Sequence, residues 1–261
     1  MNKKLTIVNL LSVLLVIVIN YVSQARYFND ITIGEVSRQY NTLFTPAGYA
    51  FSIWGIIFLS LFAYVIFQIR RVFFSKKDSD FVTKTGYWFF IANLLNSLWV
   101  LAFTYDYTGL SVLLMIGILF SLIQIILKTN MERWDAPISI IAFVWWPICL
   151  YSGWISVATI ANIATYLVKI NWSGFGISSE TWAIVLIIAA IGINISILIK
   201  RNMREFVLVG IWALVAIYIR HKDTYQSIAI TALAGSILLI LLTTIHAYKN
   251  KDTNPFKKLN Q

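Results

Sequence analysis

Tryptophan is the residue of this sequence best suited to forming a site, because an indole ring offers a large apolar face and one N–H donor. The chain has ten tryptophans. Trp54, Trp99 and Trp154 each lie about six to eight positions in from the same end of an apolar run, or ~10 Å at helical rise. We therefore expect these three rings to meet at one depth and form an aromatic cup.

Further aromatic and amide side chains lie around the three tryptophans in the same apolar runs. Buried ring N–H and O–H groups need acceptors, and amide side chains can supply them to the rings or to a ligand. We also expect Pro147 to kink its helix and leave room for a ligand. Alternatively, these residues only fill gaps and bond neighbouring helices, as such residues often do in membranes. The surrounding candidates are Tyr49, Phe51, Asn96, Phe103, Tyr151, Ala158 and Asn162.

Other kinds of site find little support in the sequence. No Asp, Glu, Lys, Arg or His falls in the middle of an apolar run, which argues against ion coupling and acid/base catalysis within the membrane. Cys149, His221 and His246 have no partners at metal-ligand spacing, so we predict no metal site and no catalytic residue. A neutral aromatic site suits a flat, largely apolar ligand.

The elements that must position these residues are membrane helices. Hydrophobic residues make up 59% of the 261 residues and charged residues 12%, with a mean hydropathy of +0.76. These values predict an all-α integral membrane protein, a polytopic helix bundle. The seventh apolar run has only 14 residues and is the least certain span. The eight predicted spans are 5–25, 46–69, 85–105, 107–127, 137–168, 181–199, 206–219 and 224–248.

The basic residues indicate how the spans are oriented. Sixteen of the 21 Lys and Arg residues fall on one side when both termini are placed in the cytoplasm. The predicted location is the cell membrane, with the basic tail 249–261 near the cytoplasmic headgroups. Because the net charge of +10 is spread over short loops, we expect no nucleic-acid partner. The first run also fits a cleavable signal peptide, but its length favours a retained helix.

The connection over residues 23–45 is the only long one on the outer side. Long connections in compact bundles are usually functional or disordered, and the aromatic residues here argue against disorder. We expect it to cap the outer ends of the helices. Thr45 as N-cap and Pro46 at the first helical position should then begin the second helix.

Three motifs resemble the TspO/MBR family, the tryptophan-rich sensory proteins related to the translocator protein. L-L-N-S-L-W-V-L-A-F, residues 94–103, resembles that family's L-x-L-N-x-x-W-x-x-L-F-F helix. L-Y-S-G-W-I-S-V-A-T-I-A-N, residues 150–162, resembles its P-Y-x-x-W-x-x-F-A-x-x-L-N helix, with Leu150 in place of proline. Residues 45–58 are similar, more loosely, to the stretch that opens the family's second helix. Phe51 there lies three residues before Trp54, rather than four.

The resemblance covers residues 1–171 and implies a five-helix unit that binds tetrapyrroles such as protoporphyrin or haem, and in some members sterols. Residues 172–248 would add three transmembrane helices without a counterpart in five-helix members. The family has been linked to sensing, transport and porphyrin breakdown.

We therefore expect a membrane-embedded binding protein or sensor for a flat hydrophobic ligand, with no required cofactor. Its expected partners are the lipid bilayer and that ligand. The sequence leaves open whether the protein forms a homodimer. The alternatives are a carrier or channel for a neutral or hydrophobic solute and an enzyme acting on its bound pigment.

Overall fold

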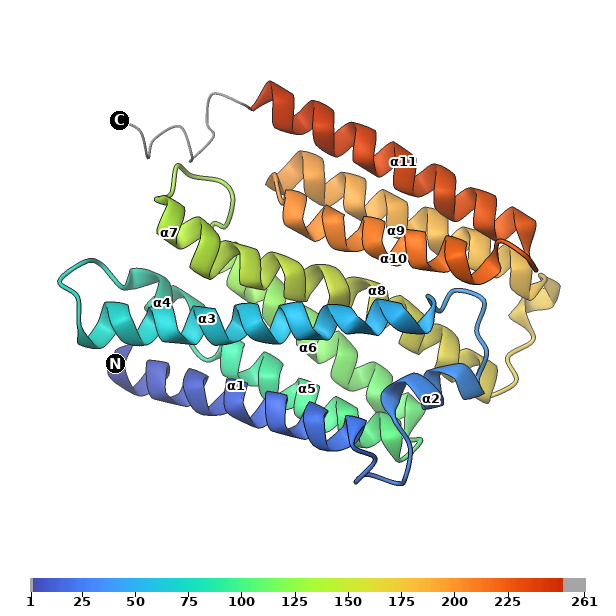
Figure 1. Ribbon diagram of the computed structural model, residues 1–261, viewed down its shortest axis with the longest axis horizontal. Coiled ribbons are helices and arrows are strands. Elements are labelled where there is room, and N and C mark those ends of the chain that lie inside the picture. The colour runs from blue at the N-terminus through green and yellow to red at the C-terminus, as the bar shows by residue number, and fades with distance from the viewer. Residues whose placement is uncertain (1, 251–261) are drawn as a thin grey trace.

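The computed structural model describes residues 2–250, and helices are the only regular elements within that range (Figure 1). The fold class predicted from the sequence is confirmed. Short elements precede or connect the long helices: α2 (Ile33–Gln39), η1 (Gly48–Ser52), α4 (Asp80–Thr85), α7 (Ile138–Ile140), η2 (Ile141–Trp145) and η3 (Gly174–Gly176). The long helices are α1 (Asn2–Gln24), α3 (Ile53–Phe73), α5 (Trp88–Thr104), α6 (Thr108–Lys128), α8 (Trp146–Lys169), α9 (Ser179–Arg201), α10 (Arg204–His221) and α11 (Gln226–Lys249).

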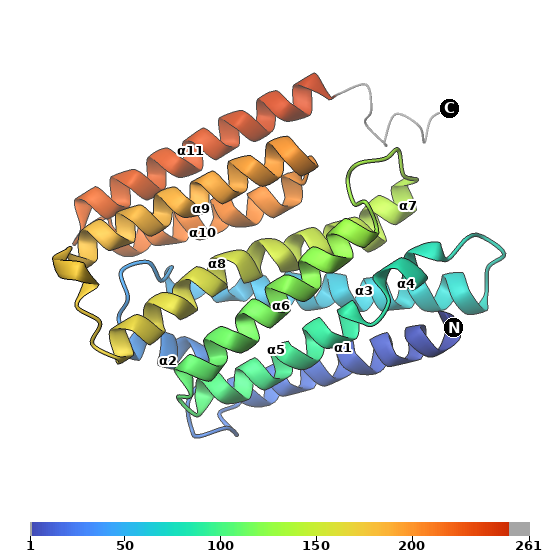
Figure 2. The same ribbon diagram turned by 180° about the vertical axis from the view of Figure 1, so that it is seen from behind.

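Five of the long helices form a closed bundle. α1 packs against α3 and α5, α5 against α6, α6 against α8, and α8 against α3, so the contacts run once around the bundle. Figure 2 shows α5, α6 and α8 side by side on one face. The hydrophobic core includes Trp54 of α3, Trp99 of α5 and Trp154 of α8.

Amides and hydroxyls attach α1 to this bundle from within. Asn9 donates to Gln68 of α3 at 3.1 Å, and Asn20 donates to Asn96 of α5 at 3.3 Å. Such bonds replace water for polar groups inside the membrane. They supply α1 with specific partners in the bundle.

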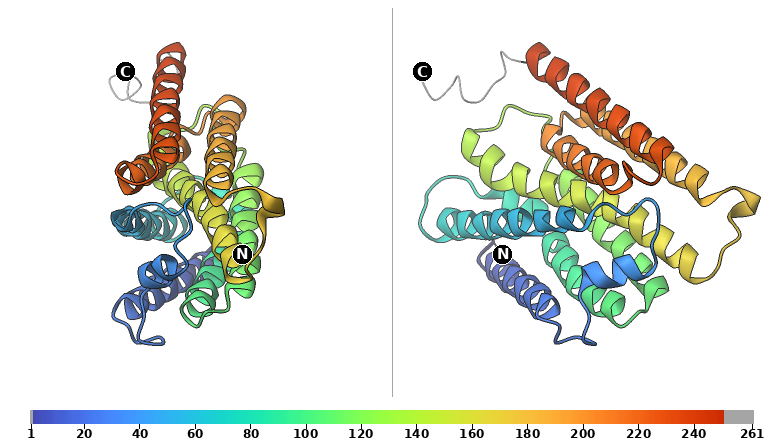
Figure 3. Two further views of the ribbon diagram at one scale, coloured as in Figure 1. Left: turned by 90° about the vertical axis from the view of Figure 1, so that its right-hand side faces the viewer. Right: turned by 45° about the vertical axis from the view of Figure 1, so that its right-hand side comes forward.

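The last three long helices pack on one another and meet the bundle through α10. α10 contacts α8, and α9 and α11 both contact α10 and each other. Figure 3 shows α11 on the side of this group away from α1. The approach of α8 to α10 is close at Gly153, where a Cβ atom would lie 2.9 Å from the carbonyl oxygen of Phe206. Glycine is therefore required at the junction between the two groups of helices.

Six helical segments of the described range are long and apolar enough to span a membrane. They begin with α1, the segment Gly48–Phe73 and α6, and continue with the segment Ile138–Lys169, α9 and α11. The 17-residue helix α5 is apolar but shorter, and α10 carries Arg204, Glu205 and Arg220 near its ends. The protein is thus a multi-pass membrane protein, and the count of eight spans stays a prediction. Most of the predicted basic tail, residues 251–261, lies outside the described residues.

The expected helix start at Thr45 and Pro46 is wrong. A 3-10 helix begins at Gly48 with Ala47 as N-cap, and α3 follows only from Ile53. The reason is tertiary: the Thr45 hydroxyl bonds the hydroxyl of Thr42, and the amide of Ala47 donates to the carbonyl of Ala216 in α10 at 3.1 Å. These partners replace the cap that local sequence suggested.

The irregular part of the long fifth run lies before Pro147. Residues 141–145 form a π-helical turn, and Pro147 follows directly as the second residue of α8. The expected proline kink is thus a π-helical insertion at Ile141–Trp145.

Candidate functional site

The three tryptophans singled out by depth line one cavity beneath the cap. Trp54 comes from α3, Trp99 from α5 and Trp154 from α8, and each is less than 9% exposed. We call this space the aromatic cavity. Seven of the ten candidate residues line it: Phe51, Trp54, Trp99, Phe103, Trp154, Ala158 and Asn162.

Ring contacts and one amide fix the walls of the cavity. Trp99 stacks on Phe103 with ring centroids 5.3 Å apart, and Trp154 meets the edge of Phe51 at 5.9 Å. The indole N–H of Trp99 donates to the side-chain oxygen of Asn162 at 2.6 Å. Asn162 thus supplies the acceptor expected for a buried ring and holds Trp99 in one orientation.

The other three candidates lie outside the lining. Tyr49 is 41% exposed and packs edge-to-face on Trp212 of α10 at 5.2 Å. Asn96 and Tyr151 are fully buried, and Asn96 donates to the Tyr151 hydroxyl at 3.0 Å. For Asn96 the structure favours the alternative of a bond between helices, while Tyr151 supports the cavity by contacting Trp54.

Sequence reasoning missed the residues that the cap contributes to this lining. Ile33 and Ser37 belong to α2, a helix we did not predict within the connection. A signal for it exists, since Thr32 and Glu35 form a capping box, the S/T-x-x-E pattern of a helix start. The remaining unpredicted lining residues are Thr45, Pro46, Val157, Ala161 and Thr165.

The aromatic cavity is small. Its volume is about 40 Å³, enough for water molecules, whereas sites for drug-sized ligands occupy about 300–1,000 Å³. Our expectation of a roomy site is wrong for this conformation, because the aromatic side chains pack on one another. A porphyrin can enter only if the cap opens and the rings turn outward.

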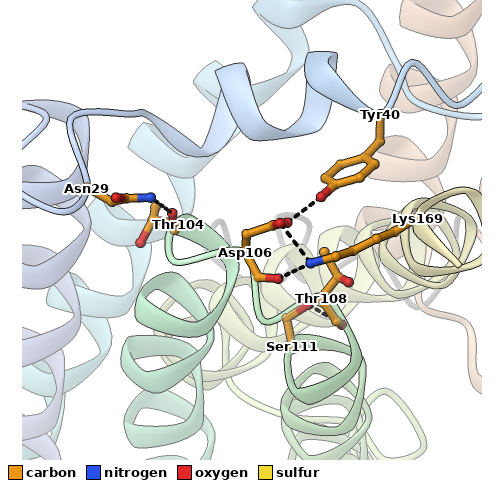
Figure 4. A network of polar contacts seen from close by, with 7 residues as sticks. All are labelled: Asn29, Tyr40, Thr104, Asp106, Thr108, Ser111 and Lys169. Carbon is orange, nitrogen blue, oxygen red and sulfur yellow. Dashed lines mark hydrogen bonds and ion pairs between the residues drawn. The ribbon is translucent and has the colours of Figure 1, made fainter.

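One edge of the cap is anchored on the turn between α5 and α6 (Figure 4). Tyr40 donates its hydroxyl to the carboxylate of Asp106 at 2.5 Å, and Lys169 at the end of α8 pairs with the same carboxylate at 2.7 Å. Asn29 donates to the carbonyl of Thr104 at 3.0 Å. Burial raises the pKa of Tyr40 to about 12, and the bond to Asp106 and its charge add to the shift, so the phenol stays a donor at neutral pH.

The other edge of the cap is held by the end of α10. One guanidinium nitrogen of Arg220 donates to the carbonyls of Thr42 and Thr45, at 3.0 and 2.6 Å. Its other terminal nitrogen donates to the side chain of Asn41 at 2.8 Å. His221 Nε2 lies 2.9 Å from the carbonyl oxygen of Leu43. We call Arg220 and His221 the latch.

A cluster of possible metal ligands lies among residues far apart in the sequence. Glu132, Cys149 and Glu205 place their ligand atoms within 4.8 Å of one another. Burial raises the pKa of Glu132 to about 8, and the charge of Glu205 adds to the shift. The three residues come from a loop, α8 and α10, so their spacing could not group them. Our prediction of no metal site was argued from local spacing alone and stays a prediction.

Comparison with known proteins places this architecture in a family. No curated protein and no solved structure matches the chain. A family model described as TSPO-like protein matches residues 6–245, a range that includes all of the helices α9 and α10 and most of α11. The chain therefore belongs to the TSPO-like protein family.

Proposed function

We propose that this membrane protein binds a flat, largely apolar ligand in the aromatic cavity and acts as its sensor or binding protein. The observation that carries the proposal is the meeting of Trp54, Trp99 and Trp154 around one space roofed by the cap. Large rings bind flat apolar molecules through their faces. The described residues of the lining carry no charge, which matches a ligand with an uncharged body.

Among tetrapyrroles, the lining suits a metal-free porphyrin such as protoporphyrin better than haem. Haem iron in proteins takes a His, Cys, Met or Tyr axial ligand. None of these residue types occurs among the described residues that line the aromatic cavity. Rings and small residues such as Ala158 and Ala161 suit the ligand's faces instead.

A carrier for a hydrophobic solute is the second hypothesis, and it would require a route through the bundle. The lining comes from the cap and from the parts of α3, α5 and α8 nearest to it. This placement favours binding beneath the cap over passage across the membrane. Solute flux into proteoliposomes, without a ligand-dependent change in fluorescence, would support the carrier.

Fluorescence titration with protoporphyrin tests the binding proposal. We expect saturable quenching of intrinsic fluorescence in the wild-type protein, and its loss in the double variant Trp99→Ala/Trp154→Ala. Trp88→Ala/Trp134→Ala is the matched control, because it removes two indoles outside the cavity lining. Equal affinity in the wild-type protein and in the cavity variant, both folded, would refute the proposed site. Loss of the porphyrin absorbance band with the wild-type protein, but not with the cavity variant, would instead indicate pigment breakdown.

The topology belongs to the proposal as well. We propose a cell-membrane protein with both termini in the cytoplasm, supported by the distribution of Lys and Arg. Thiol labelling of single cysteines introduced near each terminus of a Cys149→Ser protein, in intact and opened cells, distinguishes this orientation from its inverse.

A further inference from the structure

A second and larger space lies on the other side of the cap segment, and no feature of the aromatic cavity accounts for it. It has a volume of about 440 Å³ and lies between residues 40–44, the end of α8, residues 172–177 and the start of α9. We call it the outer groove. Its volume falls within the lower part of the range found for small-molecule sites.

The walls of the groove are apolar along the helices. Ala164 and Leu167 of α8 face Ala183 and Leu186 of α9 across the groove, and Phe44 of the cap closes one side. None of the described lining residues is Lys, Arg, Asp, Glu or His. A charged ligand would therefore find no ionic partner on these walls. An apolar chain would exchange contacts with lipid or water for contacts with the apolar walls of the groove.

Polar groups gather at the end of the groove nearest the cap and the α8–α9 connection. They belong to Asn41 and Thr42 on the cap, to Ser173 within the α8–α9 connection and to Ser179 at the start of α9. The Asn41 oxygen already accepts from Arg220. The Thr42 hydroxyl bonds that of Thr45, and the Thr42 carbonyl accepts from Arg220. This end therefore offers a ligand the hydroxyls of Ser173 and Ser179 together with backbone groups, which suits a neutral polar group.

Two tryptophans give this end a defined wall. Trp172 and Trp182 lie with ring centroids 5.2 Å apart, and Trp182 donates its indole N–H to the carbonyl of Gly174 at 2.9 Å. Gly174 has φ of +65°, a conformation that favours glycine, so the wall depends on this turn. Indole rings prefer the boundary between hydrocarbon and water, which places this end of the groove at the membrane interface.

The groove is open to the lipid-facing surface. Ile163, Val168 and Ile177 belong to its lining and are 36%, 46% and 46% exposed. A ligand can therefore enter sideways from the bilayer, with its apolar part between α8 and α9 and its polar end at the interface. The hollow shape, bounded by cap, connection and two helices, fits a small molecule better than a flat protein partner.

We propose that the outer groove binds a neutral single-chain amphiphile from the outer leaflet, of the kind represented by a monoacylglycerol. Its chain lies between α8 and α9, and its hydroxyl groups meet the polar end beside Trp172 and Trp182. This proposal is independent of the ligand of the aromatic cavity.

Photocrosslinking in phosphatidylcholine nanodiscs tests the proposal. The probe is a monoacylglycerol with a diazirine in its chain, and mass spectrometry maps the adducts. We expect saturable labelling of residues 163–186, reduced at least 10-fold by excess unlabelled monoacylglycerol. Ala164→Trp fills the groove and should reduce labelling similarly. The matched control is Ile188→Trp, since Ile188 of α9 is 56% exposed and lies outside the groove lining.

Three results would overturn the proposal. Labelling that rises linearly with probe and resists competition would indicate ordinary surface lipid. Equal saturable labelling of folded Ala164→Trp and wild-type protein would place the amphiphile elsewhere. Stronger labelling by a diazirine fatty-acid anion or by phosphatidylglycerol would contradict the neutral character of the site. If Ala164→Trp fails to fold, the wild-type protein decides by itself, because competition shows whether a saturable site exists and mapping shows whether it is this groove.

Discussion

Replacing Arg220 by alanine should release the cap from α10. The variant loses two hydrogen bonds from a guanidinium to the carbonyls of Thr42 and Thr45, and a third to Asn41. Hydrogen bonds to charged groups contribute about 1.5–3 kcal/mol each. Taking the lower value for the two carbonyl bonds, and nothing for the exposed third because of solvent screening, gives about 3 kcal/mol. At 1.4 kcal/mol per factor of ten, cap opening should become about 100-fold more frequent.

Amide hydrogen exchange measures this opening directly. The Ala47 amide donates to the carbonyl of Ala216 in α10, so its protection reports on contact between cap and helix. We expect exchange in residues 41–47 to accelerate about 100-fold, with little change in α5 and α6. Lys222→Ala is the control, since Lys222 is also a cation at this end of α10 but pairs only with Asp223 at 4.0 Å, among the described residues. Exchange within threefold of wild type in a folded Arg220→Ala protein would refute the latch.

Three further predictions concern packing and charge. Asn162→Ala leaves the buried indole N–H of Trp99 without its acceptor, so the free energy of unfolding should fall by about 1–3 kcal/mol, seen as a lower melting temperature in detergent; an unchanged value would contradict the bond's role. Gly153→Ala forces α8 from α10 and should cost about 1–3 kcal/mol, whereas Gly55→Ala, with nothing within 4 Å of its Cβ, should cost far less. The pKa of Glu132 is about 8 in the folded protein against 4.5 ordinarily, so the unfolded chain loses this proton first and stability should decline as pH rises between these values. Glu132→Gln should weaken that decline in melts at pH 5 and 8.5, and an identical pH profile would refute the assignment.

Depth along the apolar runs was enough to group the tryptophans of the cavity. Trp54, Trp99 and Trp154 lie far apart in the sequence, but each helix advances by a fixed rise per residue, so equal distance from a membrane surface becomes equal height in the bundle. The same arithmetic carries no information on which way a side chain points around its helix. Tyr49 and Asn96 lie close to Trp54 and Trp99 in the sequence but face α10 and α1 instead.

The size of the cavity could not be predicted from residue types. Whether aromatic residues surround a space or fill it depends on rotamers and on a few ångströms of helix separation. Here Phe51, Phe103 and the three tryptophans occupy most of the space that they enclose. The start of the second span failed for a similar reason. Thr45 is a good N-cap by type, but its hydroxyl bonds Thr42, and Arg220 holds its carbonyl.

The helices after residue 171 bear on both sites because α10 holds the segment that separates them. Phe44 lines the outer groove, while Thr45 and Pro46 line the aromatic cavity. Arg220 donates to the carbonyls of Thr42 and Thr45 in this same segment. A ligand too large for the closed cavity must displace this segment and thereby one wall of the groove. We therefore expect occupancy of either proposed site to change the free energy of cap opening at the other, and by linkage the effect would be reciprocal. The three tryptophans come from the five-helix bundle alone, whereas the latch comes from α10. On this proposal, the latch couples access to the aromatic cavity with the shape of the outer groove.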